Sequence, residues 1–332
     1  MQCMGIVGTG VIGAGWTVRC LARGLDVLAW DPGVNAEAKL RSTVDSAWPI
    51  LTKLGSFPKA DKSRLHFVKT IEDVAKSADF IQESAPEHED LKRSLHAQMD
   101  AVAPANVIIA SSSSGLLPSR IQSACTHPER IVIGHPFNPV YLLPLVEVMG
   151  GENTSSDTIE HAMATYTDLG MHALRVRKEI EGYLADRLQE ALWREALHLV
   201  NDGVATTEEL DAAIVYGPGL RWAIMGTCLT FHMAGGDAGM RHMLEQFGPA
   251  LKLPWTRLKA PELTEQLIDR MVQGTDNQAA GRTVKELERL RDDCLIAIMQ
   301  ALRQYGVGAG QALIDDEVRR GSKHSKDGAD VE

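Results

Sequence analysis

Four polar positions in this sequence could carry acid–base chemistry on a small substrate. His135 follows an apolar segment, and Glu147 stands inside the apolar run 143–149. Four serines occupy 111–114, and Asp186 lies in the segment E-G-Y-L-A-D-R. A carboxylate in a buried strand needs a polar partner, and a histidine paired with an acid makes an oriented base. The oxidation of an alcohol requires such a base beside the carbinol carbon.

A glycine-rich turn near the start of the chain predicts a dinucleotide site. The turn follows the apolar run 4–7 and opens a helical pattern over 11–23, and a second apolar run, 26–30, ends in Asp31. Glycines allow a tight turn and let backbone N–H groups approach a pyrophosphate at the helix N-terminus. The acid is placed to accept hydrogen bonds from an adenosine ribose. The candidate residues of the turn are Gly8, Thr9, Gly10, Val11, Ile12 and Gly13.

The acid also discriminates between the two nicotinamide cofactors. A carboxylate at Asp31 would repel a 2′-phosphate, and the next residues, Pro32 and Gly33, supply no arginine to bind one. We therefore expect NAD rather than NADP as the cofactor.

Composition and charge exclude several other classes of protein. The formal net charge of −10 argues against a nucleic-acid or anionic-membrane partner. Five scattered cysteines form no C-x-x-C pair, which argues against a disulfide framework or a zinc site and favours the reducing cytoplasm. The glycine turn begins within the first ten residues, so no signal peptide is expected, and no apolar stretch is long enough to span a bilayer.

The first half of the chain alternates strand-like and helical patterns. Helices are expected at 36–54, 87–103 and 158–169. The alternation predicts a parallel, doubly wound α/β sheet of the Rossmann type, with ligands beyond the carboxyl ends of the strands. The serine run and His135 lie at such ends. Besides 4–7 and 26–30, strands are expected at 65–69, 79–84, 107–111, 131–135 and 145–149.

Beyond about residue 180 the strand signals stop. Helical patterns over 183–200, 207–215 and 284–305 predict an all-helical C-terminal domain. An apolar stripe over 287–302 fits either core packing or a subunit interface, and we expect a homodimer formed through this domain. The expected divisions are 1–180 for the NAD-binding domain, 181–320 for the helical substrate and dimerisation domain, and 321–332 for a disordered tail.

The motifs as a set resemble those of the 3-hydroxyacyl-CoA dehydrogenase family. The shared segments are G-x-G-x-x-G, S-S-S-S-G-L, G-H-P-F-N-P, L-V-E-V and E-G-Y-L-A-D-R, and the resemblance covers the chain except its tail. It implies an N-terminal NAD domain followed by a helical dimerisation domain.

This resemblance implies a role for each polar position. His135 would take the hydroxyl proton as hydride leaves for the nicotinamide, and Glu147 would orient His135 and stabilise its imidazolium form. Ser114 would hydrogen-bond the substrate oxygen. Ser112 would lie by the nicotinamide ribose and Asn138 near the nicotinamide. Further positions implied to line the cofactor are Ser84, Glu87 and Lys92.

Longer segments resemble a branch of the family that oxidises a small substrate, L-carnitine. The acyl-CoA members usually carry Asn where this chain has Asp186, and an anion there would suit a cationic substrate. Carnitine is a 3-hydroxy acid whose quaternary ammonium group has no N–H, so aromatic faces and carboxylates must hold it. The segments that carry this resemblance are 135–151, 192–199, 219–225, 234–247 and 253–256.

Aromatic residues make up only 5% of the chain, so their positions are informative. Phe137 and Tyr141 flank the histidine motif and are the preferred members of a cage for the ammonium group. Trp193 and Trp222, in the helical domain, are further candidates. The substrate carboxylate needs a cation, and the sequence does not choose among Arg187, Arg194 and Arg221.

Two alternatives remain open at this point. The chain could be a dehydrogenase of 3-hydroxyacyl-CoA or of another small 3-hydroxy acid. The segment 36–64 mixes basic and acidic residues, and this mildly basic character weighs against CoA phosphates. The chain could instead be a non-catalytic NAD-binding protein, against which Ser114, His135 and Glu147 argue.

Overall fold

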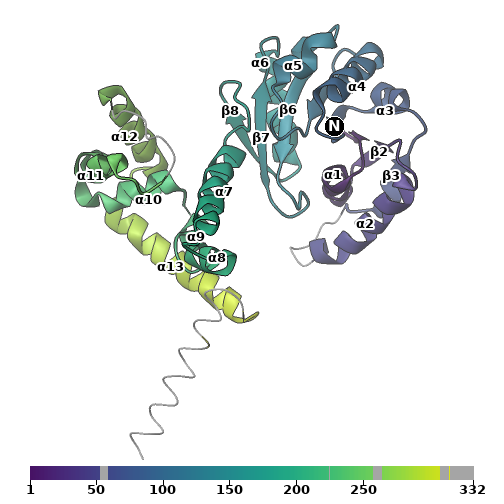
Figure 1. Ribbon diagram of the computed structural model, residues 1–332. Coiled ribbons are helices and arrows are strands. Elements are labelled where there is room, and N and C mark those ends of the chain that lie inside the picture. The colour runs from purple at the N-terminus through teal and green to yellow at the C-terminus, as the bar shows by residue number, and fades with distance from the viewer. Residues whose placement is uncertain (53–58, 224, 257–263, 307–313, 315–332) are drawn as a thin grey trace, which may run out of the picture. The chain divides into compact units, whose positions relative to one another are not determined.

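The alternating apolar and helical segments of the first half form one eight-stranded sheet in the computed structural model (Figure 1). The structure describes residues 1–52, 59–223, 225–256, 264–306 and 314. The strand order across the sheet is β3-β2-β1-β4-β5-β6-β7-β8. The strands are β1 (Cys3–Val7), β2 (Asp26–Trp30), β3 (Leu65–Phe67), β4 (Phe80–Glu83), β5 (Ile108–Ser111), β6 (Ile131–Pro136), β7 (Leu145–Gly150) and β8 (His172–Val176). Every strand expected from the sequence is present, within two residues of its expected bounds.

The sheet is parallel from β3 to β6, and its last two strands run the other way. β7 pairs antiparallel with β6, and β8 pairs parallel with β7. A parallel neighbour would need a crossover of about a dozen residues or more, usually a helix. The connection 137–144 contains only turns and bends, so the chain reverses and returns alongside β6. The predicted Rossmann-type sheet is confirmed, with this reversal added to it.

Helices cover both faces of the sheet, and each face has its own buried core. One core includes Trp16, Leu40 and Tyr166, and the other includes Val74 and Met99. The first face is covered by α1 (Val11–Ala22), α2 (Ala36–Thr52) and α6 (Ser156–Asp168), and the second by α3 (Ile71–Ser77), α4 (Glu89–Val102) and α5 (Pro118–Ile121). Short 3-10 turns are η1 (Lys62–Arg64), η2 (Gln122–Ala124) and η3 (Pro128–Arg130).

The sequence patterns did not predict β8 or α3. In β8 only Val176 is buried, so this edge strand lacks the apolar run that marks the inner strands. α3 spans only two turns, and a capping box formed by Thr70 and Asp73 starts it. Both elements depend more on their neighbours than on a periodic pattern of their own.

The described residues of the C-terminal unit form helices joined by short connections, with no strand among them. Capping boxes at Thr206 with Glu209 and at Thr283 with Glu286 start two of its helices. Met233 and Leu287 belong to a small buried core. The helices are α8 (Thr207–Val215), α9 (Pro218–Trp222), α10 (Thr227–Ala234), α11 (Gly239–Phe247), α12 (Glu265–Ala279) and α13 (Val284–Arg303), with 3-10 turns η4 (Gly236–Ala238) and η5 (Gly248–Lys252). The predicted helical C-terminal domain is confirmed.

Two compact units, Met1–Gln189 and Glu190–Glu332, divide the chain inside α7 (Ala185–Asn201). The division between the units falls within a single helix, α7. The expected domain boundary at residue 180 stays a prediction. The expected disordered tail, 321–332, lies outside the described residues. None of the helices that the structure describes has both the length and the apolar character needed to cross a membrane.

Candidate active site

The reversal between β6 and β7 places His135 directly opposite Glu147 in the sheet. The two residues are register partners, and Nδ1 of His135 lies 2.9 Å from Oε2 of Glu147. Both side chains are buried. An ionised carboxylate only accepts hydrogen bonds, so Nδ1 carries the proton and donates it to this bond. With Nδ1 as the donor, Nε2 is the ring atom that remains to accept a proton in the neutral form of the imidazole.

Glu147 also joins the histidine to the start of α7. Its Oε1 accepts hydrogen bonds from the backbone N–H groups of Leu184, at 3.0 Å, and Ala185, at 2.9 Å. These amides belong to the N-terminal end of the helix, where the macrodipole favours an anion. With three donors on its two oxygens, the buried carboxylate is fully partnered and holds the imidazole ring in one orientation.

Asp186, in the first turn of α7, lies on the opposite side of the imidazole. Its Oδ2 is 3.7 Å from Nε2 of His135, and about a third of its side chain is exposed (32%). The histidine is therefore flanked by two carboxylates, a buried one at Nδ1 and a partly exposed one at Nε2. The segment E-G-Y-L-A-D-R supplies both the amides that bind Glu147 and this second acid.

Two aromatic rings pack edge-on against His135. The ring centroids of Phe137 and Tyr183 lie 4.8 Å and 5.3 Å from that of the imidazole. Tyr183 is fully buried, its hydroxyl donates to the carbonyl of Leu116 at 2.8 Å, and burial raises its pKa far above the ordinary value. The phenol therefore stays a protonated donor that ties the histidine's surroundings to the serine loop.

Tyr183 was not predicted from the sequence, which selected only Asp186 and Arg187 as candidates from this segment. Its backbone is left-handed (φ 47°) and follows Gly182, which is also left-handed (φ 70°). A non-glycine residue in this region carries strain that the surrounding contacts must offset. This pair turns the chain so that the following amides face Glu147. The sequence signal that could have indicated this turn is Gly182, directly before Tyr183 at the start of a helical pattern.

Glu87 fixes the backbone of the serine loop that includes Ser114. One of its oxygens accepts hydrogen bonds from the Ser113 hydroxyl, the Ser114 N–H at 3.0 Å and the Gly115 N–H at 3.1 Å. Burial alone would raise the pKa of Glu87, but the hydrogen bond from Ser113, the charge of Lys92 and the two amides outweigh burial and lower it. The ionised Glu87 therefore holds Ser114 in place, and the Ser114 side chain is exposed.

A buried polar network lies under the second predicted serine, Ser112. Its hydroxyl accepts hydrogen bonds from the Trp16 indole at 3.2 Å and from the Gln82 amide at 2.7 Å, and lies 2.9 Å from the hydroxyl of Ser84. Tyr166 in turn donates to the Gln82 side-chain oxygen at 2.6 Å. The network fixes Ser112 and Ser84 at the carboxyl ends of β5 and β4. Trp16 and Gln82 were not predicted, because their partners are distant in sequence.

Lys92, expected beside the cofactor, is buried among oxygen atoms. Its ammonium group lies 2.8 Å from Oε1 of Glu83, 3.0 Å from the carbonyl of Ala85 and 3.5 Å from Oε2 of Glu87, and its side chain is 1% exposed. Glu83 also accepts from the hydroxyl of Ser111 at 2.6 Å. Lys92 thus pairs with Glu87, which in turn binds the serine loop. A contact between Lys92 and the cofactor stays a prediction.

The glycine turn forms the cradle that a dinucleotide needs. A Cβ at Gly13 would lie 1.9 Å from the carbonyl oxygen of Gly8, whereas a Cβ at Gly10 would meet nothing within 4 Å. Gly10 is the N-cap of α1 and no side chain caps it, so its open N-terminus fits a pyrophosphate. Asp31 accepts from the N–H and hydroxyl of Thr9, at 2.7 and 3.1 Å, at the end of β2. These residues fit NAD at the expected positions.

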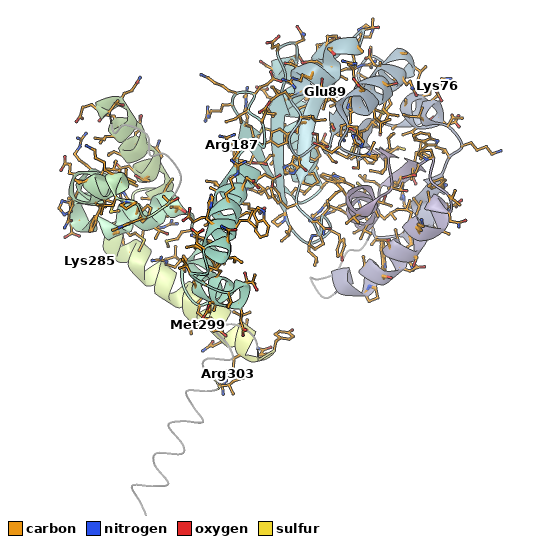
Figure 2. All side chains as sticks on the ribbon, in the orientation of Figure 1. Lys76, Glu89, Arg187, Lys285, Met299 and Arg303 are labelled. Atoms are coloured by element: carbon orange, nitrogen blue, oxygen red, sulfur yellow. The ribbon has the colours of Figure 1, made fainter. Side chains whose placement is uncertain are left out.

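The remaining candidates for substrate binding, and Asn138 as a candidate for nicotinamide binding, are distributed over both units. Phe137, Asn138 and Tyr141 lie in the connection 137–144, whereas Trp193 and Trp222 belong to the second unit and are 58% and 38% exposed. Among the candidate cations, Arg187 lies in the first turn of α7 (Figure 2) and donates to the carbonyl of Glu181 at 3.1 Å. Arg194 pairs with Glu190 one turn away on the same helix, and Arg221 lies in α9.

Comparison with known protein families matches both units of this fold. Residues 3–180 match the NAD-binding domain of 3-hydroxyacyl-CoA dehydrogenase, and residues 182–281 match the C-terminal domain of the same enzyme. The chain belongs to the 3-hydroxyacyl-CoA dehydrogenase family. Its cofactor is NAD, and it is a dehydrogenase that acts on a CH–OH group.

Individual relatives narrow the resemblance further. The chain is 61% identical to the L-carnitine dehydrogenase of Pseudomonas aeruginosa, over 93% of this chain and 96% of that protein. It is 60% identical to the L-carnitine dehydrogenase of Pseudomonas putida, with the same coverage of 93% and 96%. Among solved structures, a 5-formyl-3-hydroxy-2-methylpyridine 4-carboxylic acid 5-dehydrogenase, an NAD+-dependent dismutase, is 27% identical, with a TM-score of 0.72 over 91% of this chain and 98% of that one.

Within this family, the geometry can be compared with what alcohol oxidation requires. Dehydrogenation of a CH–OH group needs a hydride acceptor, a base for the hydroxyl proton and a donor to the oxygen. The sheet provides an oriented histidine, a fixed serine loop and an open glycine cradle at the carboxyl ends of its parallel strands. In the described parts of the chain, no three His, Cys, Asp or Glu side chains are arranged to hold a metal ion.

Proposed function

We propose that this dehydrogenase oxidises L-carnitine to 3-dehydrocarnitine with NAD as the hydride acceptor. The observation that carries the proposal is the carboxylate of Asp186, 3.7 Å from Nε2 of His135. A cationic 3-hydroxy acid bound with its hydroxyl at Nε2 would bring its ammonium group near this anion. The names and the identity of the relatives, 61% and 60% over most of the chain, support the same substrate.

His135 is the general base in this proposal. Nε2 takes the hydroxyl proton while NAD, when bound, supplies the hydride acceptor. Glu147 keeps the ring in orientation through Nδ1 and stabilises the imidazolium that forms, without itself taking the proton. Ser114, whose backbone Glu87 holds, donates to the substrate oxygen. This donor favours the charge that develops on the oxygen as the proton leaves.

The cofactor residues of this proposal lie in the segments that follow the carboxyl ends of β1, β2, β4, β5 and β6. The glycine turn holds the pyrophosphate, and Asp31 accepts from the adenosine ribose. Ser112 lies by the nicotinamide ribose and Asn138 near the nicotinamide. The other positions that we assign to the cofactor surroundings are Ser84, Glu87 and Lys92.

A cage of aromatic rings beside an acid would hold the trimethylammonium group. Phe137 and Tyr141 come from the connection after β6, and Asp186 adds the negative charge. A good cation–π contact contributes about 0.5–2 kcal/mol, depending on how far the cation is desolvated. Trp193 and Trp222 remain candidates for the same role. The partner of the substrate carboxylate is one of Arg187, Arg194 and Arg221.

A substrate panel tests the proposed function. NADH formation is measured at alkaline pH with L-carnitine, D-carnitine, 3-hydroxybutyrate and 3-hydroxybutyryl-CoA, and with NADP in place of NAD. We expect activity with L-carnitine and NAD that exceeds every other combination by a factor of about ten or more, which corresponds to one good recognition contact. Activity on the CoA ester without activity on carnitine would keep the family and overturn the substrate. NADH binding without turnover on any of the four substrates would overturn the proposed oxidation of L-carnitine.

We also propose that the chain acts as a homodimer through its helical half. Leu188 and Leu192 lie one helical turn apart on α7 and form a short apolar stripe, and they are 71% and 48% exposed. Apolar patches of this kind on a soluble protein mark an interaction surface. A second copy of the chain would cover this stripe.

The double variant Leu188→Asp with Leu192→Asp should turn the dimer into a monomer, because two buried carboxylates without partners would be expensive in the interface. Light scattering during size-exclusion chromatography measures the mass directly. The control is Leu91→Asp on α4 of the first unit, which is 39% exposed and should leave the mass unchanged. A monomeric wild-type protein, or a double variant that stays dimeric, would rule out this surface.

A reducing compartment, the cytoplasm, is the location that we propose. All five cysteines are free thiols, and burial raises the pKa of Cys20 to about 12 and that of Cys125 to about 12. Thiols with such high pKa values are poor nucleophiles and behave as small apolar side chains.

A further inference from the structure

A buried arginine joins the cofactor helix to the connection that follows the catalytic histidine. Arg19, on α1, is 7% exposed. Its guanidinium donates to the carbonyl oxygens of Val140 at 2.7 Å and Leu143 at 3.2 Å, both in the connection 137–144. It also donates to the carbonyls of Leu169 at 3.3 Å and Gly170 at 3.4 Å, which follow α6. In the described ranges, no carboxylate lies within ion-pair distance of it.

A charge in this position needs a physical reason. Desolvation of a guanidinium is costly, and an apolar side chain of the same length would avoid the cost. Burial, together with the nearby charge of Arg23, lowers the pKa of Arg19 to about 10, so the group stays charged at neutral pH. Four carbonyl oxygens, two of them at the negative end of α6, stabilise this charge. The guanidinium thereby holds three segments together: α1, the connection 137–144 and the residues that follow α6.

A second contact lies one helical turn earlier on the same face of α1. A Cβ at Gly15 would lie only 2.9 Å from the Cβ of Val140, whose side chain is fully buried. The missing side chain at Gly15 therefore lets the connection lie directly on the helix, while Arg19 holds its carbonyls. The contact at Gly15 and the hydrogen bonds from Arg19 are independent observations, and both identify the connection 137–144 as docked on α1.

We propose that Arg19 is a positioning residue that clamps the connection 137–144 onto α1 and thereby sets the substrate and nicotinamide contacts of the site. α1 begins at the pyrophosphate cradle, and the connection carries Phe137, Asn138 and Tyr141. The clamp fixes the distance between the cofactor and these three side chains. Their roles toward substrate rest on the proposed function, but the clamp itself does not.

The test compares Arg19→Met and Arg19→Lys with a matched control, Arg23→Met. Arg23, the C-cap of α1, lies one turn beyond Arg19, and its guanidinium donates to the same Leu169 carbonyl at 3.2 Å. The readouts are KM and kcat for the oxidised substrate, the Kd of NADH by fluorescence, and hydrogen exchange of the peptide that covers 137–144. All are measured well below the Tm of each variant.

For Arg19→Met we expect kcat/KM for the alcohol to fall by about 30-fold or more, because misplacing positioning groups by about an ångström costs on the order of 10²-fold. The Kd of NADH should stay within about threefold, since the glycine cradle is untouched, and exchange in 137–144 should accelerate. Arg19→Lys should recover part of the loss through one or two hydrogen bonds. Arg23→Met should change neither kcat/KM nor loop exchange by more than about threefold.

Two results would overturn the clamp. The first is an Arg19→Met protein with a lower Tm but unchanged kinetics and unchanged loop exchange, since the arginine would then serve folding alone. The second is a loss of NADH binding as large as the loss of turnover. Gly15→Ala supplies a second route, because its methyl group would push Val140 outward and should accelerate exchange of the same peptide. Loop exchange needs no substrate, so failure of the carnitine assignment leaves this readout intact.

Discussion

Replacing His135 with glutamine should lower kcat for alcohol oxidation by about 10²-fold or more, the usual contribution of a general base. The glutamine amide can still donate to Glu147, so the buried carboxylate keeps a partner and the fold should hold. Glutamine has no nitrogen lone pair that can take the hydroxyl proton. The Kd of NADH, measured by fluorescence, should stay within about threefold, because the base does not contribute to the glycine cradle.

A matched control for this variant is His172→Gln. His172 is exposed and begins β8 in the same sheet, so it reports the cost of a histidine replacement away from the site. Its kcat should stay within about twofold of the wild-type value, as for most surface substitutions. Near-normal turnover in His135→Gln, with a normal control, would remove the histidine from the mechanism and leave the pairing with Glu147 as a structural feature.

The first unit was largely predictable because its signals are local. The strand, glycine turn, helix, strand and acid of 4–31 lie within one short stretch, and each element has its own apolar period. The register of His135 with Glu147 was not a local signal. It follows from the short connection 137–144, which cannot cross the sheet and must reverse. The pairing of the two residues was expected from chemistry, and the reversal explains why they are direct register partners.

The supporting residues escaped the sequence analysis for a common physical reason. The partners of Gln82, Trp16 and Arg19 lie 30 or more positions away along the chain. Each of these side chains also fits an ordinary helix or strand position, so neither its type nor its spacing marks it. Tyr183 differs, because its left-handed backbone after Gly182 is a local feature. Contacts between distant segments need the fold before they can be recognised.

The acid on the other side of the histidine gives the second large expected effect. Asp186→Asn should lower kcat/KM for L-carnitine by about 10- to 100-fold relative to 3-hydroxybutyrate, a 3-hydroxy acid without the ammonium group. That range corresponds to about 1.4–2.7 kcal/mol of lost attraction for the ammonium group. It is modest for two opposite charges at close range because Asp186 is a third exposed and water screens it. The asparagine is nearly the same size, so the packing around His135 should survive.

A ratio of substrates is needed because Asp186 also faces Nε2 of His135. Removing its charge alters the surroundings of the base for every substrate, and that effect cancels when L-carnitine and 3-hydroxybutyrate are compared in the same variant. Salt supplies an independent measurement, since attraction between exposed charges weakens as ionic strength rises. The KM of the wild-type enzyme for L-carnitine should therefore rise with salt, and that of Asp186→Asn should rise much less.

The control for this experiment is Glu190→Gln, one turn further along α7. Glu190 is an exposed acid that pairs with Arg194 on the helix surface, so it tests the loss of a carboxylate from α7 in general. It should leave the substrate ratio within about twofold. If Asp186→Asn lowers the rates on both substrates equally, the acid acts on the base alone, and the ammonium group must be held by aromatic rings without it. If the ratio changes in Asp186→Asn but not in Glu190→Gln, then Asp186 determines the preference for a substrate with an ammonium group. The acyl-CoA members of the family usually carry Asn at this position.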